Sequence, residues 1–395
     1  MKSIHILHHS ISPFRSQYPE KDPISYNSGI PMLFARAIRE RYLDAEIEVW
    51  RPERTVSDTV VWTDDDQVTH RIYPSLYLRY NLELSVPMLK AIRREVRNPK
   101  ARFWVHGIYN LHAYLAAHIL RDAPVIAQSH GGYPARQMYQ ISRHRWLRYA
   151  YLPLAMVERL CLRHYREVFA ISSTEADYLR SLCSESGSNI SMSPTGVDFD
   201  MFCPGDRLSA RDSLGLDETG DIALFVGRLT RDKGLEVLID ACAIAVRKRP
   251  ELALYIVGSG PLMDTLQDYV VRRDISEHVH LVGYVRPKFL PYWYRAANVT
   301  VVPSSIEWFG KISVESMACG TPVIITAGGA SDDLIGAFGA GQVVPPDAPD
   351  TLADALCDAF SGGPASRPDV NSGREAFDWS AKLSRAMTAF EQMAR

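Results

Sequence analysis

Two basic residues in the second half of the sequence have the types and spacing that suit a diphosphate. In the segment Gly227-Arg228-Leu-Thr-Arg-Asp-Lys233-Gly234, Arg228 directly follows a short apolar run, and Lys233 stands where a helix is expected to begin. A guanidinium offers a forked donor, an ammonium offers a point charge, and the free N–H groups of a helix start favour anions. Two solvated basic residues in a loop would show the same spacing, so this segment alone leaves both interpretations open.

A second segment, Glu307-Trp-Phe-Gly310-Lys-Ile-Ser-Val-Glu315, joins two acids to a glycine. Gly310 allows close backbone approach, and the N–H groups of Lys311 and Ile312 begin another predicted helix. Carboxylates accept hydrogen bonds from sugar hydroxyls, so Glu307 and Glu315 suit a hydroxylated ligand. The alternative is a solvated loop acid at Glu307 and a first-turn acid at Glu315 that complements the helix dipole.

The elements that would position these residues alternate between strand and helix. Short apolar runs predict buried strands, and apolar residues at three- and four-residue spacing predict helices with one buried face. The strands are expected at 223–227, 252–258, 280–283, 299–302 and 322–325, and the helices at 234–249, 262–273, 289–297 and 312–319. This alternation predicts a doubly wound parallel sheet, in which ligands bind beyond the carboxyl ends of the strands. The charged residues of both segments follow such ends.

The first half predicts a second domain of the same α/β class with longer loops. Strands are expected at 4–7, 46–50, 103–105, 125–127 and 168–171, and a helix at 30–41. A polar stretch with Pro and Gly predicts a linker, and residues 379–393 predict a final amphipathic helix. Two similar halves leave the cleft between them as the expected ligand site.

Composition excludes several classes of protein. The chain has 395 residues and a formal net charge of −2, too small a charge to coat nucleic acid by neutralising phosphates. The six scattered cysteines form no C-x-x-C pair, which disfavours a structural zinc site and a disulfide framework. No apolar run reaches the roughly 18 residues that span a bilayer, so we expect a cytoplasmic protein.

Together these motifs resemble the carboxy-terminal domain of retaining family 4 glycosyltransferases. The similarity rests on Arg228 with Lys233-Gly234, on Gly258-Ser-Gly260-Pro261, and on the segment from Glu307 through Glu315 to Gly320-Thr-Pro-Val. The segment Gly196-Val-Asp-Phe-Asp-Met-Phe-Cys-Pro204 resembles the interdomain region of the same family, and the final helix resembles its crossing helix.

The resemblance implies a GT-B fold, in which two Rossmann-like domains face a central cleft and the C-terminal helix crosses back to the first domain. It implies an acceptor-binding domain at 1–195, a linker at 196–217, a donor-binding domain at 218–375 and the crossing helix at 376–395. It also implies metal-independent transfer of a sugar from a nucleotide-diphosphate donor, without a cofactor. UDP is the expected nucleotide because it is the most frequent one in the family.

Site roles follow from the resemblance, position by position. Arg228 and Lys233 would hold the donor diphosphate, with N–H groups from Phe309 to Ile312 contacting sugar and phosphate. Glu307 would bind hydroxyls of the transferred sugar, Glu315 would bind the ribose, and Gly258 and Val285 would lie near the base.

In the first domain the family places a glycine pair after the first strand, whereas this chain has Asn27-Ser28-Gly29 after a long loop. Of the two glycines that contact phosphate in the family, only Gly29 is therefore expected to do so in this chain. The family also places a catalytic histidine at a strand end. His130 in Ser129-His130-Gly131-Gly132 matches that position, and His106 is its competitor. No carboxylate nucleophile is evident, so retention predicts front-face substitution assisted by the leaving phosphate.

A basic and aromatic segment at residues 136–166 predicts a partner. It holds seven arginines against one acid, with Trp146 and four tyrosines interleaved. Such a surface suits an anionic membrane, here the inner face of the plasma membrane, or a lipid-linked acceptor. A solvated helix face with ordinary core aromatics is the alternative. Glycan, lipid-linked and small-molecule acceptors all stay open, and the expected setting is glycan, cell-envelope or glycoconjugate biosynthesis.

Two other functions fit the same architecture. A sugar-nucleotide epimerase would convert the donor without an acceptor. An inactive glycosyltransferase-like partner subunit would be expected to lose Lys233, Glu307 or His130, and all three are present.

Overall fold

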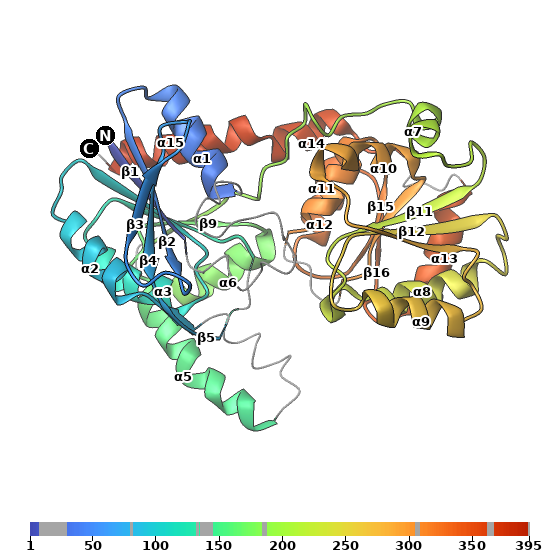
Figure 1. Cartoon of the computed structure of the whole chain (residues 1–395), viewed down its shortest axis with the longest axis horizontal. Helices are drawn as coiled ribbons and strands as arrows, with labels where there is room; N and C mark the ends of the chain where they lie inside the picture. The colour runs from blue at the N-terminus through green and yellow to red at the C-terminus, as the bar shows by residue number, and fades with distance from the viewer. Residues whose placement is uncertain are drawn as a thin grey trace. The chain divides into compact units, whose positions relative to one another are not determined.

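The chain forms two compact units. A computed structural model describes residues 1–7, 30–79, 82–131, 134, 145–183, 188–304, 309–361 and 367–393. Unit 1 comprises Met1–Pro194 and Lys382–Arg395, and unit 2 comprises Thr195–Ala381. Both units are α/β units built on a parallel sheet (Figure 1).

Unit 1 contains an eight-stranded sheet in the order β10-β9-β8-β7-β1-β2-β4-β3. All neighbours in this sheet pair in parallel, except β3, which is antiparallel to β4. The strands are β1 (Lys2–Leu7), β2 (Glu46–Glu53), β3 (Val60–Thr63), β4 (Thr69–Pro74), β7 (Ala101–His106), β8 (Val125–Gln128), β9 (Glu167–Ala170) and β10 (Asn189–Met192); a separate pair is formed by β5 (Leu76–Arg79) and β6 (Leu82–Leu84).

Helices cover both faces of this sheet. The main apolar core lies between one face and the helices α2 (Val86–Glu95), α3 (Leu111–Leu120), α5 (Arg145–Leu162) and α6 (Ser173–Cys183). On the other face, α1 (Ile30–Arg41) places the ring of Phe34 against Trp104. The C-terminal helix α15 (Trp379–Met393) also belongs to unit 1 from Lys382 onward, since Glu391 accepts a hydrogen bond from Tyr42 (2.7 Å).

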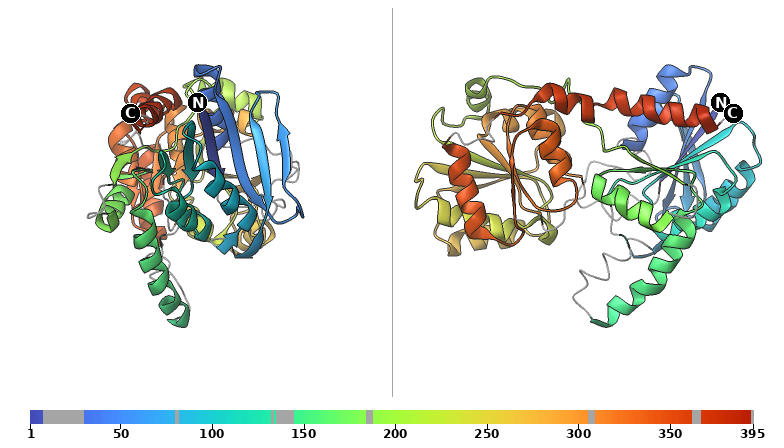
Figure 2. Two further views of the ribbon diagram at one scale, coloured as in Figure 1. Left: turned by 90° about the vertical axis from the view of Figure 1, so that its left-hand side faces the viewer. Right: turned by 180° about the vertical axis from the view of Figure 1, so that it is seen from behind.

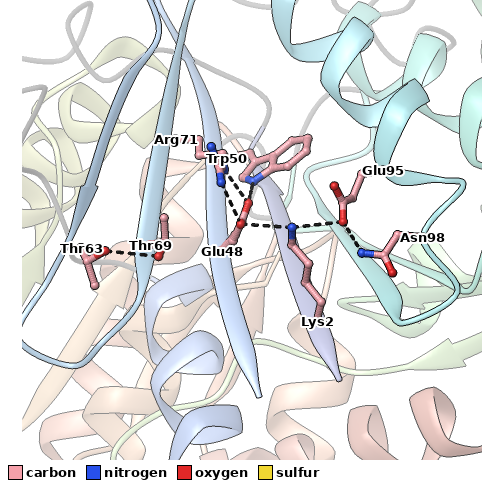
Figure 3. A network of polar contacts seen from close by, with 8 residues as sticks. All are labelled: Lys2, Glu48, Trp50, Thr63, Thr69, Arg71, Glu95 and Asn98. Atoms are coloured by element: carbon pink, nitrogen blue, oxygen red, sulfur yellow. Dashed lines mark hydrogen bonds and ion pairs between the residues drawn. The ribbon is translucent and has the colours of Figure 1, made fainter. Parts of the chain in front are cut away.

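A buried carboxylate joins three strands and a helix at the amino end of β1 (Figure 3). Glu48 on β2 accepts hydrogen bonds from Trp50 (2.6 Å) and from Arg71 on β4 (2.7 and 3.1 Å). Lys2 lies 3.2 Å from Glu48 and 3.0 Å from Glu95 at the end of α2. Burial would raise the pKa of Glu48, but these donors outweigh it and hold the pKa below its ordinary value. Glu48 is therefore a charged cross-link of the sheet.

Unit 2 contains a six-stranded parallel sheet in the order β13-β12-β11-β14-β15-β16. Helices α8, α9 and α13 cover one face, and α10, α11, α12 and α14 cover the other (Figure 1). The strands are β11 (Asp221–Val226), β12 (Leu252–Val257), β13 (Val279–Gly283), β14 (Val299–Val302), β15 (Val323–Thr326) and β16 (Gln342–Val344). The helices are α7 (Arg207–Leu214), α8 (Leu235–Ala245), α9 (Met263–Arg272), α10 (Leu290–Ala296), α11 (Lys311–Ala318), α12 (Ser331–Phe338), α13 (Pro349–Phe360) and α14 (Val370–Phe377).

The stretch 196–217, which the sequence predicts as a linker, is part of unit 2. It contains α7, whose Arg211 is only 2% exposed and donates to the carbonyls of Ala296 (3.0 Å) and Glu218 (2.8 Å) and to the Asn298 side chain (2.8 Å). A buried guanidinium with this many acceptors fixes the segment to α10 and β14.

Candidate active site

The loops that follow β11 and β14 meet at the carboxyl end of the unit 2 sheet. After β11, Arg228 is exposed, and a single 3₁₀ turn over Arg231–Lys233 leads into α8. The half-buried Lys233 donates a hydrogen bond of 3.4 Å to the hydroxyl of Ser304, two residues beyond β14. The strand-end position expected for Arg228 and Lys233 is therefore the observed one, and the pairing of β11 with β14 brings Ser304 to Lys233.

Glycines let the backbones of three loops lie in direct contact. Gly258, with φ +145°, would place a Cβ 1.8 Å from the carbonyl oxygen of Gly227. Gly260 would place a Cβ 2.5 Å from the carbonyl oxygen of Leu229, whose N–H donates to Ser259 (3.0 Å). The loop after β12 thus holds the loop of Arg228 through main-chain contacts that exclude any side chain. Gly258 also donates to the carbonyl of Gly283, and the half-buried Val285 follows two residues later.

The start of α11 contributes backbone donors and a buried acid. Gly310, with φ +74°, precedes the first helical residue, so the N–H groups of Lys311 and Ile312 lie in the first turn. Glu315 is 3% exposed and accepts a hydrogen bond from Tyr294 (2.9 Å), while Lys311 lies 2.8 Å from its other oxygen. Phe309 is buried, with its ring 5.8 Å from that of Phe377.

Two residues with predicted roles, Gly29 and Glu307, lie outside the described residues. Among the described residues, no three His, Cys, Asp or Glu side chains are grouped so that they could hold a metal ion.

In unit 1, the two competing histidines are hydrogen-bonded to each other. His106 is the last residue of β7, and His130 follows β8 by two residues. Their Nδ1 and Nε2 atoms are 2.8 Å apart, and their rings are stacked at 5.1 Å with an interplanar angle of 9°. His106 is 1% exposed and His130 is only partly buried, so His130 is the member of the pair that solvent reaches.

A buried acid that sequence reasoning missed supports the loop of His130. Glu175 on α6 accepts a hydrogen bond from the Ser129 hydroxyl (2.7 Å) and another from the Ile171 N–H (2.8 Å). Burial raises the pKa of Glu175 despite these donors. Ser304 and Tyr294 were missed as well, although Ser304 follows a predicted strand and strand-end reasoning could have included it.

The two parallel α/β units, each with candidate site residues at the carboxyl ends of its strands, define a protein of the GT-B class. A model of the family "Glycosyltransferase Family 4" matches residues 34–201, and a model of "Glycosyl transferases group 1" matches residues 206–373. The chain belongs to the family 4 glycosyltransferases, which confirms the resemblance seen in the motifs.

The curated relatives include several enzymes named D-inositol 3-phosphate glycosyltransferase. The D-inositol 3-phosphate glycosyltransferase of Segniliparus rotundus is 36% identical over 159 residues, which cover 39% of this chain and 35% of that protein. The enzyme of the same name from Pseudarthrobacter chlorophenolicus is 28% identical over 387 residues, covering 91% and 87%. The match spans about a third to just over half of the length of the first relatives, from 35% to 56%.

Solved structures agree on the fold. Sucrose-phosphate synthase from Thermosynechococcus elongatus superposes with a TM-score of 0.76 at 23% identity, covering 100% of this chain and 99% of that one. Anabaena HepE in complex with UDP superposes with a TM-score of 0.71 at 16% identity, covering 99% of this chain and 100% of that one.

Within the described residues, none of the helices is both long enough and apolar enough to span a bilayer.

Proposed function

We propose that this protein transfers a sugar from a nucleotide-diphosphate donor to an acceptor hydroxyl, with retention of configuration and without a metal ion. The observation that carries the proposal is the hydrogen bond from Lys233 to Ser304, which joins the loops at the ends of β11 and β14. The exposed Arg228 lies on the first of these loops, against which the glycines of the β12 loop pack. Family membership supports it. UDP is the first nucleotide to test, since it is the ligand of the Anabaena neighbour.

In this proposal the chain acts by placing positive charge where negative charge develops. The departing diphosphate gains charge, and Arg228, Lys233 and the N–H groups of Lys311 and Ile312 would stabilise it. Glu315 would bind ribose hydroxyls through the lone pairs that Tyr294 and Lys311 do not occupy, because a carboxylate offers about four acceptor positions. Glu307 would bind hydroxyls of the transferred sugar, and a leaving phosphate oxygen would take the proton of the acceptor.

The test compares Lys233→Ala with Lys248→Ala, an exposed lysine of the same unit that is paired with Asp354. Titration calorimetry with UDP should show wild-type binding in Lys248→Ala and at least tenfold weaker binding in Lys233→Ala, because an ion contact to phosphate is lost. Equal affinities in the two variants would remove Lys233 from the site. The anomeric configuration of the product, read by NMR, tests retention.

A sugar-nucleotide epimerase on the same fold is the second function. It would convert the nucleotide sugar without an acceptor, so incubation with donor alone separates it from a transferase. An inactive partner subunit would bind the donor and turn over nothing with any acceptor. The names of the curated relatives make D-inositol 3-phosphate the first acceptor to include.

A membrane surface as partner is supported by α5. This helix projects from unit 1 (Figure 2), and its side chains Met156 and Leu160 are 65% and 45% exposed beside the exposed Arg159 and Arg163. Apolar groups next to arginines suit an anionic bilayer surface, at the inner face of the plasma membrane if the protein is cytoplasmic. Met156→Ser should lower co-sedimentation with phosphatidylglycerol vesicles, whereas Leu208→Ser, an exposed leucine of unit 2, should not; equal recovery would refute this surface.

A further inference from the structure

A row of aromatic rings crosses the sheet of unit 1 on the face that α1 covers. His5 on β1 lies beside Trp104 on β7 in the register of the sheet, with ring centroids 5.5 Å apart. Trp104 stacks on His106 at 5.4 Å with an angle of 11°, and His106 stacks on His130. Residues two apart on a strand share a face, which places Ser3 and His5, and Trp104 and His106, in one line.

Hydrogen bonds run along this row without a gap. The Ser3 hydroxyl lies 3.2 Å from His5 Nε2, His5 Nδ1 lies 3.1 Å from His106 Nε2, and His106 Nδ1 lies 2.8 Å from His130 Nε2. Ser3, His5 and His106 are each no more than 1% exposed. His5 and His106 therefore use both ring nitrogens in the row, within the core of the unit.

A neutral imidazole has one N–H and one lone pair, so the bonds of such a row must all point in the same direction. His5 is neutral, because full burial lowers its pKa to about 3. The direction is decided at Ser3. Within the described residues, His5 is the hydrogen-bond partner of this buried hydroxyl, and an O–H left without an acceptor would cost free energy. Ser3 therefore donates to His5 Nε2.

We propose that Ser3, His5 and His106 form a relay that fixes the ring and the tautomer of His130. Each ring receives a hydrogen bond at Nε2 and carries its own proton on Nδ1, from which His5 donates to His106 and His106 donates to His130. His130 then carries its proton on Nδ1, an atom buried within the unit, and presents a single fixed tautomer to a bound substrate. The last statement rests on the proposed function, and the tautomer itself does not.

His5 and His106 are positioning residues in this scheme, because they act through His130. A histidine whose second nitrogen is held by a fixed partner keeps a single tautomer, and the wrong tautomer disables a catalytic histidine. The row also explains why a partly exposed ring stays in place. Stacking on His106 fixes its plane, and the bond to His106 Nδ1 fixes its rotation.

The experiment records the ring nitrogens of the full-length chain labelled with ¹⁵N-histidine, in long-range ¹H–¹⁵N spectra at neutral pH. His130 is assigned from the spectrum of His130→Gln. In the wild type, we expect widely separated nitrogen signals with the proton on Nδ1 for His5, His106 and His130. A proton on Nε2 of His130, or averaged signals from two tautomers, would overturn the relay.

The variant His106→Phe keeps the stacked ring and removes the donor to His130. We expect the two nitrogen signals of His130 to move together as its tautomers mix, while His112→Phe, at a buried histidine on α3, leaves them in place. Unchanged His130 signals in His106→Phe would overturn the proposal, and the wild-type tautomers decide it if that variant does not fold.

With an active donor and acceptor pair, His106→Phe should lower kcat about tenfold or more and change the donor KM less than twofold, because the lost interaction acts on the reacting centre. A wild type without transferase activity would refute the proposed function and leave the tautomer result intact. Loss of binding alone, with kcat unchanged, would assign His106 a merely structural role.

Discussion

The contact between Gly234 and Pro303 offers a sharp test of how unit 2 positions the groups proposed to bind phosphate. Gly234 has φ +63°, and a Cβ added there would lie 2.0 Å from the carbonyl oxygen of Pro303. Real Cβ atoms essentially never approach a heavy atom below 3.0 Å, so the residue before Ser304 would have to move by about 1 Å. Gly234 also directly follows Lys233, so the displacement falls on both partners of the hydrogen bond that joins the two loops.

Gly339 provides a matched control in the same unit. It has φ +62°, and an added Cβ would meet nothing within 4 Å. Alanine in the left-handed region costs roughly 1–2 kcal/mol at either position. Overpacking adds about 1–3 kcal/mol at Gly234 alone. For a unit of this size, each kcal/mol lowers Tm by about 2–4 °C.

Scanning calorimetry and UDP titration measure the two consequences. We expect Gly234→Ala to melt at least about 3 °C below Gly339→Ala and to bind UDP about tenfold more weakly, whereas Gly339→Ala keeps wild-type affinity. If both variants lose the same Tm and keep the same affinity, the close approach of Gly234 and Pro303 has no role in shaping the site. A loss of stability without a loss of affinity would separate the fold of the loop from the function proposed for it.

Three further substitutions test the interior of the two units. Arg211→Met should lower the free energy of unfolding of unit 2 by about 2–3 kcal/mol, measured by thermal melting, because one buried and two partly buried acceptors lose their donor. Glu48→Gln should lower the free energy of unfolding by about 1–3 kcal/mol at pH 7. Because the fold holds the pKa of Glu48 below 4.5, the wild type loses this advantage as the pH falls below that value. The melting temperatures of the two proteins should therefore converge at low pH. His5→Phe should make stability less sensitive to acid. The pKa of His5 is about 3 in the fold and near 6.5 in the unfolded chain, so the unfolded chain takes up the proton first as the pH falls. The wild type should therefore lose roughly 1.4 kcal/mol of stability per pH unit below 6.5, and His5→Phe should not.

The alternation of the second half was predictable because its signals are local. Each buried strand is a short apolar run, and β14 occupies the expected residues 299–302. Helices α12, α13 and α14 were missed, because their first turns and caps are rich in Asp, Ser, Gly and Pro, which favour turns as well as helix starts. Helix α7 was read as linker for the same reason. Its Arg211 looks like a surface residue until α10 and β14 supply the acceptors.

The histidine row could not be predicted, because it depends on strand register. His5 was only one residue of the first expected strand, and His106 and His130 stood as competitors for one position. The contact of His5 with His106 follows from the pairing of β1 with β7, which joins residues 101 positions apart. The contact of His106 with His130 follows from the pairing of β7 with β8, across 24 positions. The contacts of Glu175 also depend on strand pairing, because β8 and β9 place Ser129 and Ile171 within hydrogen-bond distance of it. Local periodicity predicts the strand or helix on which such a residue lies, but it does not predict which residue of another element will contact it.

The candidate site residues of unit 1 and those of unit 2 are held by different physical means, and this difference has consequences for substitution. In unit 2, loops pack on one another through the backbone of Gly234, Gly258 and Gly260. Substitution of these glycines should therefore lower stability, whereas substitution of the exposed Arg228 should not. In unit 1, side-chain hydrogen bonds from the core support His130, so the buried polar residues are the sensitive ones. Arg228→Ala should therefore weaken the proposed diphosphate binding without lowering stability, because the Arg228 side chain is exposed. Substitutions that change the hydrogen bonding of His130 also affect the core of unit 1, because its partner His106 is buried there.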